Sequence, residues 1–119
     1  MPSVAVIGAS NAPHKFGNKA VRAYLRQGWT VYPVNPNEKT VEGLPVYATI
    51  GDVPGPVDRV SMYVPASVGI ALLEAIKAKG LKELWLNPGS ESDELVERAN
   101  ALGLDPIQAC SIVDIGERP

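Results

Sequence analysis

The feature that most constrains this chain is an apolar strand pattern that runs into a glycine and is followed by a helix pattern. Residues 4–10 read Val-Ala-Val-Ile-Gly-Ala-Ser, and apolar residues at helical spacing follow over residues 17–27. A strand, a small-residue loop and a helix in this order present backbone N–H groups and the positive end of a helix dipole to an anion. The start of the chain therefore predicts a unit that binds a nucleotide phosphate.

The rest of the chain alternates strand patterns with helix patterns. Apolar helical stripes precede Gly80 and Gly103, and Ser67 is the expected N-cap of the first of them. This alternation predicts an α/β fold of the Rossmann-like kind, with three layers and a mostly parallel sheet of about five strands. We expect a single domain over residues 1–119. The expected strands after the first are 30–34, 59–64, 83–86 and 106–109, with a possible short strand at 45–47.

The expected strand order places the first strand in the centre, between strand 30–34 and strand 59–64. Ligands of open α/β sheets bind at the carboxyl ends of the strands, next to the point where the strand order reverses. We therefore expect the loops that follow the strands to meet at one edge of the sheet. These loops are residues 8–17, 35–39, 64–67 and 87–90.

Composition narrows the classes of partner. The net charge of −2 argues against nonspecific binding to nucleic acid. No apolar run approaches the roughly 20 residues that span a bilayer, and no signal peptide is visible, so we expect no membrane association. The single cysteine, Cys110, excludes an intrachain disulfide and fits a cytoplasmic setting.

The glycine loop departs from the dinucleotide fingerprint G-x-G-x-x-G. Ser10 and Pro13 stand where that motif requires glycine. The acidic residue that would bind an adenosine ribose is missing after strand 30–34, where Val34-Asn35-Pro36 stands instead. NAD is therefore a weaker fit than a phosphate ligand of another shape.

Six short segments, in order along nearly the whole chain, resemble the small single-domain CoA-binding proteins. That family is similar to the CoA-binding domain of the succinyl-CoA synthetase alpha subunit and of nucleoside-diphosphate-forming acyl-CoA synthetases. The segments are Val6-Ile7-Gly8-Ala9-Ser10, Pro13 with Lys15, Val31-Tyr32-Pro33-Val34-Asn35-Pro36, Glu42-Gly43-Leu44-Pro45-Val46-Tyr47, Val64-Pro65, and Leu86-Asn87-Pro88-Gly89 followed by an acidic helix.

The resemblance implies coenzyme A as the cofactor and a place for each of its parts. The pyrophosphate would lie on the glycine loop and the start of the next helix, the adenine beside two proline-containing loop segments, and the 3′-phosphate near Lys39. The implied binding residues are Gly8, Ala9, Ser10, Lys15, Phe16, Gly17, Asn18, Asn35, Pro36, Lys39, Val64 and Pro65.

Several of these residues also have plain structural interpretations. Gly8 permits tight packing, Ser10 can cap a turn, and Phe16 more simply packs the loop against the core. His14 is expected to be a loop residue near the ligand, without a catalytic role. Cys110 is either a small buried residue or a thiol that meets the pantetheine end of CoA.

No set of nucleophile, base and orienting residue is visible, and no cluster of His, Cys and Asp has metal-ligand spacing. The ligases of the related families use a phosphorylated histidine from another domain, and His14 does not lie in an equivalent motif. We therefore expect a non-catalytic module that binds CoA or an acyl-CoA. Two alternatives stay open: a nucleotide-binding domain of the NAD(P)-dependent oxidoreductase type, and a CoA-sensing subunit of a larger ligase complex with an unidentified protein partner.

Overall fold

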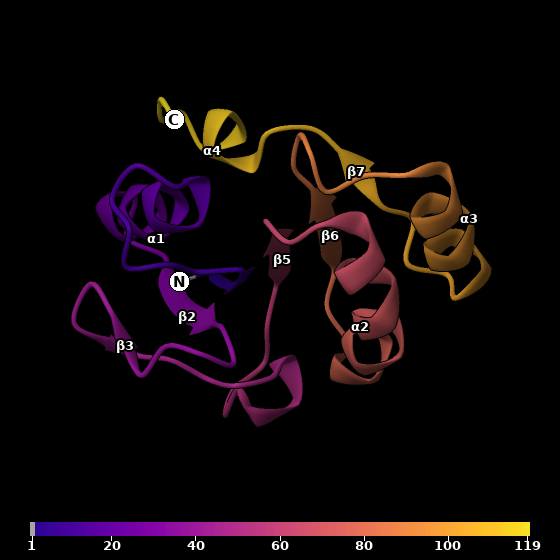
Figure 1. Ribbon diagram of the computed structural model, residues 1–119, viewed down its shortest axis with the longest axis horizontal. Coiled ribbons are helices and arrows are strands. Elements are labelled where there is room, and N and C mark those ends of the chain that lie inside the picture. The colour runs from indigo at the N-terminus through magenta and orange to yellow at the C-terminus, as the bar shows by residue number, and fades with distance from the viewer. Residues whose placement is uncertain (1) are drawn as a thin grey trace.

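The computed structural model describes residues 2–119 and shows a sheet between two layers of helices (Figure 1). Helices and strands alternate along most of the chain, as the sequence predicts. The elements are β1 (Ser3–Ile7), α1 (Phe16–Arg26), β2 (Thr30–Val34), β3 (Thr40–Val41), β4 (Leu44–Pro45), the 3-10 turn η1 (Ile50–Asp52), β5 (Arg59–Met62), α2 (Ala66–Lys79), β6 (Glu83–Leu86), α3 (Asp93–Ala101), β7 (Ile107–Gln108) and α4 (Ser111–Asp114).

The main sheet has five strands in the order β2-β1-β5-β6-β7, and all its pairs are parallel. The first strand is central, between β2 and β5, which confirms the predicted order. The strand order changes direction between β1 and β5. From β1 the chain first adds β2 on one side, and it then adds β5, β6 and β7 on the other side. The carboxyl ends of β1 and β5 are therefore where a ligand is expected.

Strand β1 is buried on both faces and divides the core in two. Val4 and Val6 pack with α1, α4 and the β3–β4 hairpin, whereas Ala5 and Ile7 pack with α2, α3 and η1. Successive side chains of a strand point to opposite faces, so a run of apolar residues is the pattern of a strand covered on both sides. Figure 1 shows the same division, with α1 and α4 apart from α2 and α3.

The structure corrects the expected start of α2. Ser67 is not the N-cap: the helix begins at Ala66, and Pro65 occupies the cap position with no side-chain hydrogen bond. The Pro65 carbonyl accepts from the amides of Val68 and Gly69, so the helical pattern starts directly after the proline. Proline has a φ that suits a helix entry and no N–H to leave unpaired.

The remaining differences are short elements. Strand β5 ends at Met62, two residues before the predicted end, and β7 has only two residues. In place of a strand over 45–47, Leu44–Pro45 pairs with Thr40–Val41 as an antiparallel hairpin. Helix α4 was not expected, since four residues are too few for a periodic signal.

Candidate functional site: a trough at the carboxyl edge of the sheet

Two glycines bring the first strand, the first helix and β5 into close contact. Gly8 has φ +92°, and a Cβ there would lie 3.1 Å from the backbone of Tyr63, just after β5. A Cβ on Gly17 would lie 2.0 Å from the carbonyl oxygen of Gly8, a distance that no real side chain tolerates. Gly17 thus has the role of the last fingerprint glycine, which lets the helix approach the strand. Sequence spacing alone did not reveal this role.

The N-termini of α1 and α2 reach this edge of the sheet with their first amides uncapped. The cap residue of α1, Lys15, and that of α2, Pro65, make no side-chain cap hydrogen bond, and neither helix has an acidic residue in its first turn. The first amides of a helix have no intrahelical partner, and the helix dipole is positive there. Both helix starts are therefore suited to an anion.

A central cleft of about 520 Å³ opens between these helix starts. It contains residues from all four loops that were expected to meet, which confirms that expectation. Of the binding residues implied by the family resemblance, eight line this cleft. They are Gly8, Ser10, Lys15, Phe16, Gly17, Asn35, Val64 and Pro65, and the cleft is completed by His14, Tyr63, Pro88, Gly89 and Ser90.

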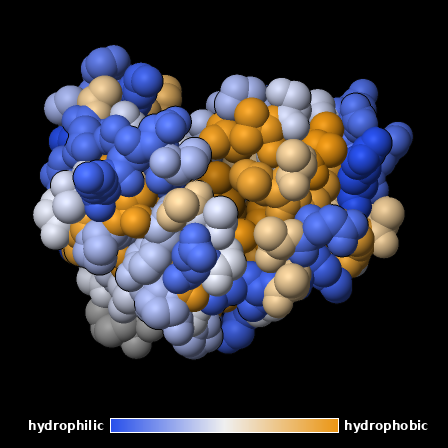
Figure 2. Space-filling model, turned by 60° about the horizontal axis from the view of Figure 1, so that its bottom comes forward, coloured by the Kyte–Doolittle hydropathy of each residue, from blue (hydrophilic) through white to orange (hydrophobic). Residues whose placement is uncertain are grey.

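A second cavity, of about 430 Å³, adjoins the central cleft and is mostly apolar. Gly8, Asn35 and Val64 line both spaces, so the two spaces meet at these residues. Its walls come from the end of β2, from η1 and from α2, where Val68 is 46% exposed. Figure 2 views the face that carries η1 and α2 and shows a broad apolar area there. Pro36, another of the implied binding residues, also lines this apolar cavity.

A third, small space of about 70 Å³ lies at the other end of the central cleft. Phe16, Tyr63 and Pro88 line both spaces, and Asn87 and Cys110 complete the small one. We call the three spaces the apolar cavity, the central cleft and the end pocket, and together they form one trough. Along the sheet edge the lining of the trough therefore changes from apolar to more polar, and then to apolar again in the narrow end pocket.

Ser10 and Asn35 hold the glycine loop in shape. The Ser10 hydroxyl accepts from the amide of Ala12 at 3.0 Å, which is the turn-capping role that the sequence allowed. The Asn35 side chain donates to the carbonyl of Ala9 at 2.7 Å and accepts from the amide of Asn37. These bonds tie the loop after β1 to the loop after β2, so that both form one wall of the trough.

Three implied binding residues lie outside the lining of the trough. Ala9 is fully buried, and Lys39 is exposed beyond the loop after β2. Asn18 is buried in α1, where its side chain donates to the Ser10 carbonyl and to Glu42 and accepts from Arg22. Asn18 thus braces the loop from behind.

Phe16 does not pack against the core, so the plainer interpretation of this residue was wrong. Its side chain is 53% exposed, and Lys19 lies over its ring, 4.9 Å from the centroid. At the first position of α1 the ring stands between the central cleft and the end pocket. His14 lies in the cleft wall, in the loop before α1.

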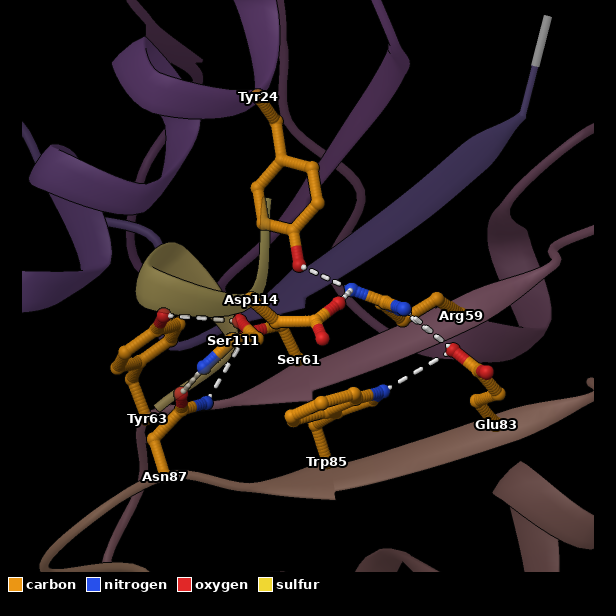
Figure 3. A network of polar contacts seen from close by, with 9 residues as sticks. All are labelled: Tyr24, Arg59, Ser61, Tyr63, Glu83, Trp85, Asn87, Ser111 and Asp114. Carbon is orange, nitrogen blue, oxygen red and sulfur yellow. Dashed lines mark hydrogen bonds and ion pairs between the residues drawn. The ribbon is translucent and has the colours of Figure 1, made fainter. Parts of the chain in front are cut away.

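A buried polar network lies directly behind the end pocket (Figure 3). Asn87 donates to the Ser61 hydroxyl and the Met62 carbonyl, and its own carbonyl accepts from the amide of Ser111. The hydroxyls of Ser61 and Ser111 lie 2.6 Å apart. Burial raises the pKa of Tyr63 to about 12, so its hydroxyl stays protonated near neutral pH. The network fixes α4 to the ends of β5 and β6.

A second polar cluster, which meets the first at α4, is centred on Arg59, a residue that sequence reasoning treated only as part of a strand. Its guanidinium lies between the rings of Trp29 and Trp85, 5.1 and 4.5 Å from their centroids. It also pairs with Glu83 and with Asp114 of α4. The two tryptophan rings thus form a stack around a cation.

The surroundings of Arg59 lower the pKa of its acidic partner, Glu83. Burial raises the pKa of Glu83, but the hydrogen bonds from Trp85 and Arg59 outweigh it and leave that pKa below its ordinary value. Glu83 is therefore ionised across the neutral range and holds Arg59 in place. This arrangement lies away from the trough lining and has a structural role.

Within residues 2–119, no group of three or more His, Cys, Asp or Glu side chains is placed to hold a metal ion. No helix in this part of the chain is both long and apolar enough to cross a membrane.

Comparison with known proteins identifies the family of this chain. The model of the CoA binding domain matches residues 2–116. The chain belongs to the CoA binding domain family. This confirms the family resemblance and disfavours the oxidoreductase alternative.

Curated relatives of this CoA-binding domain are much longer proteins. The alpha subunit of ADP-forming acetate–CoA ligase II from Pyrococcus furiosus is 35% identical over 112 residues, which is 85% of this chain but 24% of that subunit. ADP-forming acetate–CoA ligase I from Archaeoglobus fulgidus is 32% identical over 85% of this chain and 16% of its own length. The chain thus spans a quarter or less of these relatives.

Solved structures show the same fold in a protein of this size and in a longer one. A conserved hypothetical protein from Pyrococcus furiosus superposes with a TM-score of 0.89 at 34% identity, covering 96% of this chain and 99% of that one. The dinucleotide-forming acetyl-coenzyme A synthetase 1 of Ca. Korarchaeum cryptofilum, in complex with phosphate and ADP, gives 0.78 at 31% identity, covering 90% and 25%. These neighbours confirm the Rossmann-like architecture.

Proposed function

We propose that this domain binds CoA or an acyl-CoA along the trough and does not catalyse a reaction by itself. The observation that carries the proposal is the order of the three spaces. CoA has a flat aromatic ring, a pyrophosphate and a slim flexible arm that ends in a thiol, and these parts match in order the apolar cavity, the central cleft with its two open helix starts, and the narrow end pocket.

Each part of CoA has a place in this arrangement. The adenine lies in the apolar cavity, beside Pro36 and Val68. The pyrophosphate lies in the central cleft, on the first amides of α1, with Lys15 as a mobile cation. The pantetheine arm runs past Phe16 to the end pocket. Lys39, exposed just beyond the apolar cavity, is our candidate for the 3′-phosphate.

The non-catalytic role rests on what the trough contains. The central cleft has one histidine, His14, which makes no side-chain hydrogen bond within residues 2–119. The single thiol, of Cys110, lies in a different space, the end pocket. A nucleophile needs an adjacent base and an orienting group, and the trough brings no such set together. The ligase activity of the longer relatives is therefore not proposed for this domain alone.

Isothermal titration of the purified chain with CoA, NAD⁺ and ATP tests the proposal. We expect saturable binding of CoA that is tighter than that of NAD⁺ or ATP. Lys15→Ala is expected to weaken CoA binding roughly three- to tenfold, more at low salt, because an exposed cation contributes modestly to phosphate binding.

Lys77→Ala is the matched control, since Lys77 lies in the last turn of α2, at the end away from the trough. It should leave the affinity unchanged. A preference for NAD⁺, or an equal loss of affinity in both lysine variants, would contradict the proposed site.

A further inference from the structure

We propose that the end pocket limits which acyl group the domain accepts: it admits a free thiol or a small neutral acyl group and excludes longer or negatively charged ones. The inference rests on the proposed function, because it assumes that the pantetheine arm of CoA follows the central cleft. It adds a size limit and a charge limit that CoA binding alone does not require.

The size limit follows from the volume of the end pocket, about 70 Å³. A cavity of about 150 Å³ holds a benzene ring, so a space of this size takes roughly three non-hydrogen atoms. An acetyl group has that many, and a hexanoyl group has more than twice as many. Because close-packed walls yield little, the excess atoms of a longer chain must leave through the mouth or displace a wall.

The charge limit follows from the lining. None of the five lining residues carries a charge, and the polar side chain among them that is most buried, Asn87, is 2% exposed. Both N–H groups of its amide are donated to Ser61 and Met62, and its oxygen accepts from Ser111. The end pocket therefore offers no free side-chain amide to a carboxylate, and burying an unpaired carboxylate is costly.

The walls of the end pocket differ in how firmly they are held. Asn87 and Cys110 belong to the rigid side: Asn87 is hydrogen-bonded on both ends, and Cys110 directly precedes Ser111, whose amide and hydroxyl join the same network. Phe16 forms the opposite side: its ring is half exposed, lies outside both core clusters and is covered only by the Lys19 ammonium. Phe16 is thus the residue that sets the size of the opening toward the central cleft.

The test measures the affinities of CoA, acetyl-CoA, hexanoyl-CoA and succinyl-CoA for the purified chain by titration calorimetry. We expect CoA and acetyl-CoA to bind alike, and hexanoyl-CoA and succinyl-CoA to bind at least about tenfold more weakly. Equal affinities for acetyl-CoA and hexanoyl-CoA would overturn the inference while leaving the proposed function intact. Failure of CoA itself to bind would overturn the proposed function, and the inference with it.

A substitution of Phe16, the exposed wall, tests whether the size limit belongs to this pocket. Phe16→Ala removes an exposed ring, so the fold should persist, and the ratio of hexanoyl-CoA to acetyl-CoA affinity should rise severalfold. Val113→Ala removes a similarly exposed apolar side chain outside the trough and should leave the ratio unchanged. An unchanged ratio in Phe16→Ala, in a protein shown by circular dichroism to be folded, would overturn the role of Phe16 and of this pocket.

Discussion

The starts of the three longer helices, α1, α2 and α3, fall into two kinds. At α3 the Ser92 hydroxyl accepts from the amide of Leu95 at 3.1 Å, and Asp93 and Glu94 place negative charge in the first turn. At α1 and α2 there is no side-chain cap and no acid in the first turn. The uncapped pair lies at the trough, whereas α3 lies on the flank of the sheet (Figure 1). Where no ligand is expected, the chain supplies its own cap and charge, and at the trough it leaves the amides open.

The polar network behind the end pocket supports the same contrast. Asn87, Ser61 and Ser111 satisfy one another inside the protein, and no buried side-chain polar atom of the described chain lacks a partner. Polar groups that the fold needs are therefore paired among themselves. At the central cleft, by contrast, the first amides of α1 and α2 have no side-chain cap.

The largest expected effect on stability comes from a substitution that prevents the close approach of α1 to the sheet. Gly17→Ala places a methyl group against the Gly8 carbonyl, and we expect it to lower the free energy of unfolding by more than about 3 kcal/mol, as severe overpacking does. The higher helix propensity of alanine would by itself predict the opposite sign. Urea unfolding followed by circular dichroism measures the change.

Gly51→Ala is the control for this substitution. A Cβ at Gly51 would meet its nearest neighbour, the Thr49 hydroxyl, at 3.6 Å, an ordinary contact. Its effect should stay within about 0.5 kcal/mol. If Gly17→Ala were equally mild, the account of how α1 reaches the trough would be wrong.

A smaller effect separates the capped helix start from an uncapped one. Ser92→Ala removes the cap of α3 and should lower the free energy of unfolding by about 1 kcal/mol. Ser67→Ala removes a serine from the start of α2 that caps nothing and should change stability by less than about 0.5 kcal/mol. Equal losses in thermal or chemical unfolding would show that Ser67 has the capping role that its sequence position suggested.

The smallest expected change in stability comes from a substitution that should stabilise the protein and weaken CoA binding. Ser67→Asp adds a negative charge to the open start of α2 and should stabilise the free protein by about 0.5 kcal/mol through the helix dipole. The same charge should weaken CoA binding, because it competes with the phosphates for the positive end of the trough. Paired unfolding and calorimetric measurements test both signs, and tighter CoA binding in this variant would argue against an anion site there.

Much of this architecture could be predicted because it depends on patterns spread over many residues. Regular alternation of strands and helices fixes a parallel sheet, and the glycine after the first strand locates the loops that form the trough. Some of the features that the sequence did not predict depend on only a few neighbouring residues. Pro65 starts α2 two residues before the better capping residue, Ser67, and α4 is too short to leave a periodic trace.

Long-range contacts account for the rest of what was missed. Gly17 looks like any helix residue until Gly8 is placed beside it, and Arg59 looks like a strand residue until Trp29 and Trp85 surround it. Phe16 looks like a core residue because phenylalanine usually is one. These roles depend on residues distant in the chain, which spacing within one segment does not reveal.

The central claim is that the uncapped helix starts at the trough bind the phosphates of CoA. The most direct test is a titration of ¹⁵N-labelled protein with CoA, followed by amide chemical shifts. We predict that the largest changes fall on Ser10, Phe16 and Gly17, with smaller ones at the start of α2 and almost none at Asp93 and Glu94 of α3. Changes centred on α3, or a saturable binding event that leaves the amides of Phe16 and Gly17 unmoved, would contradict the account.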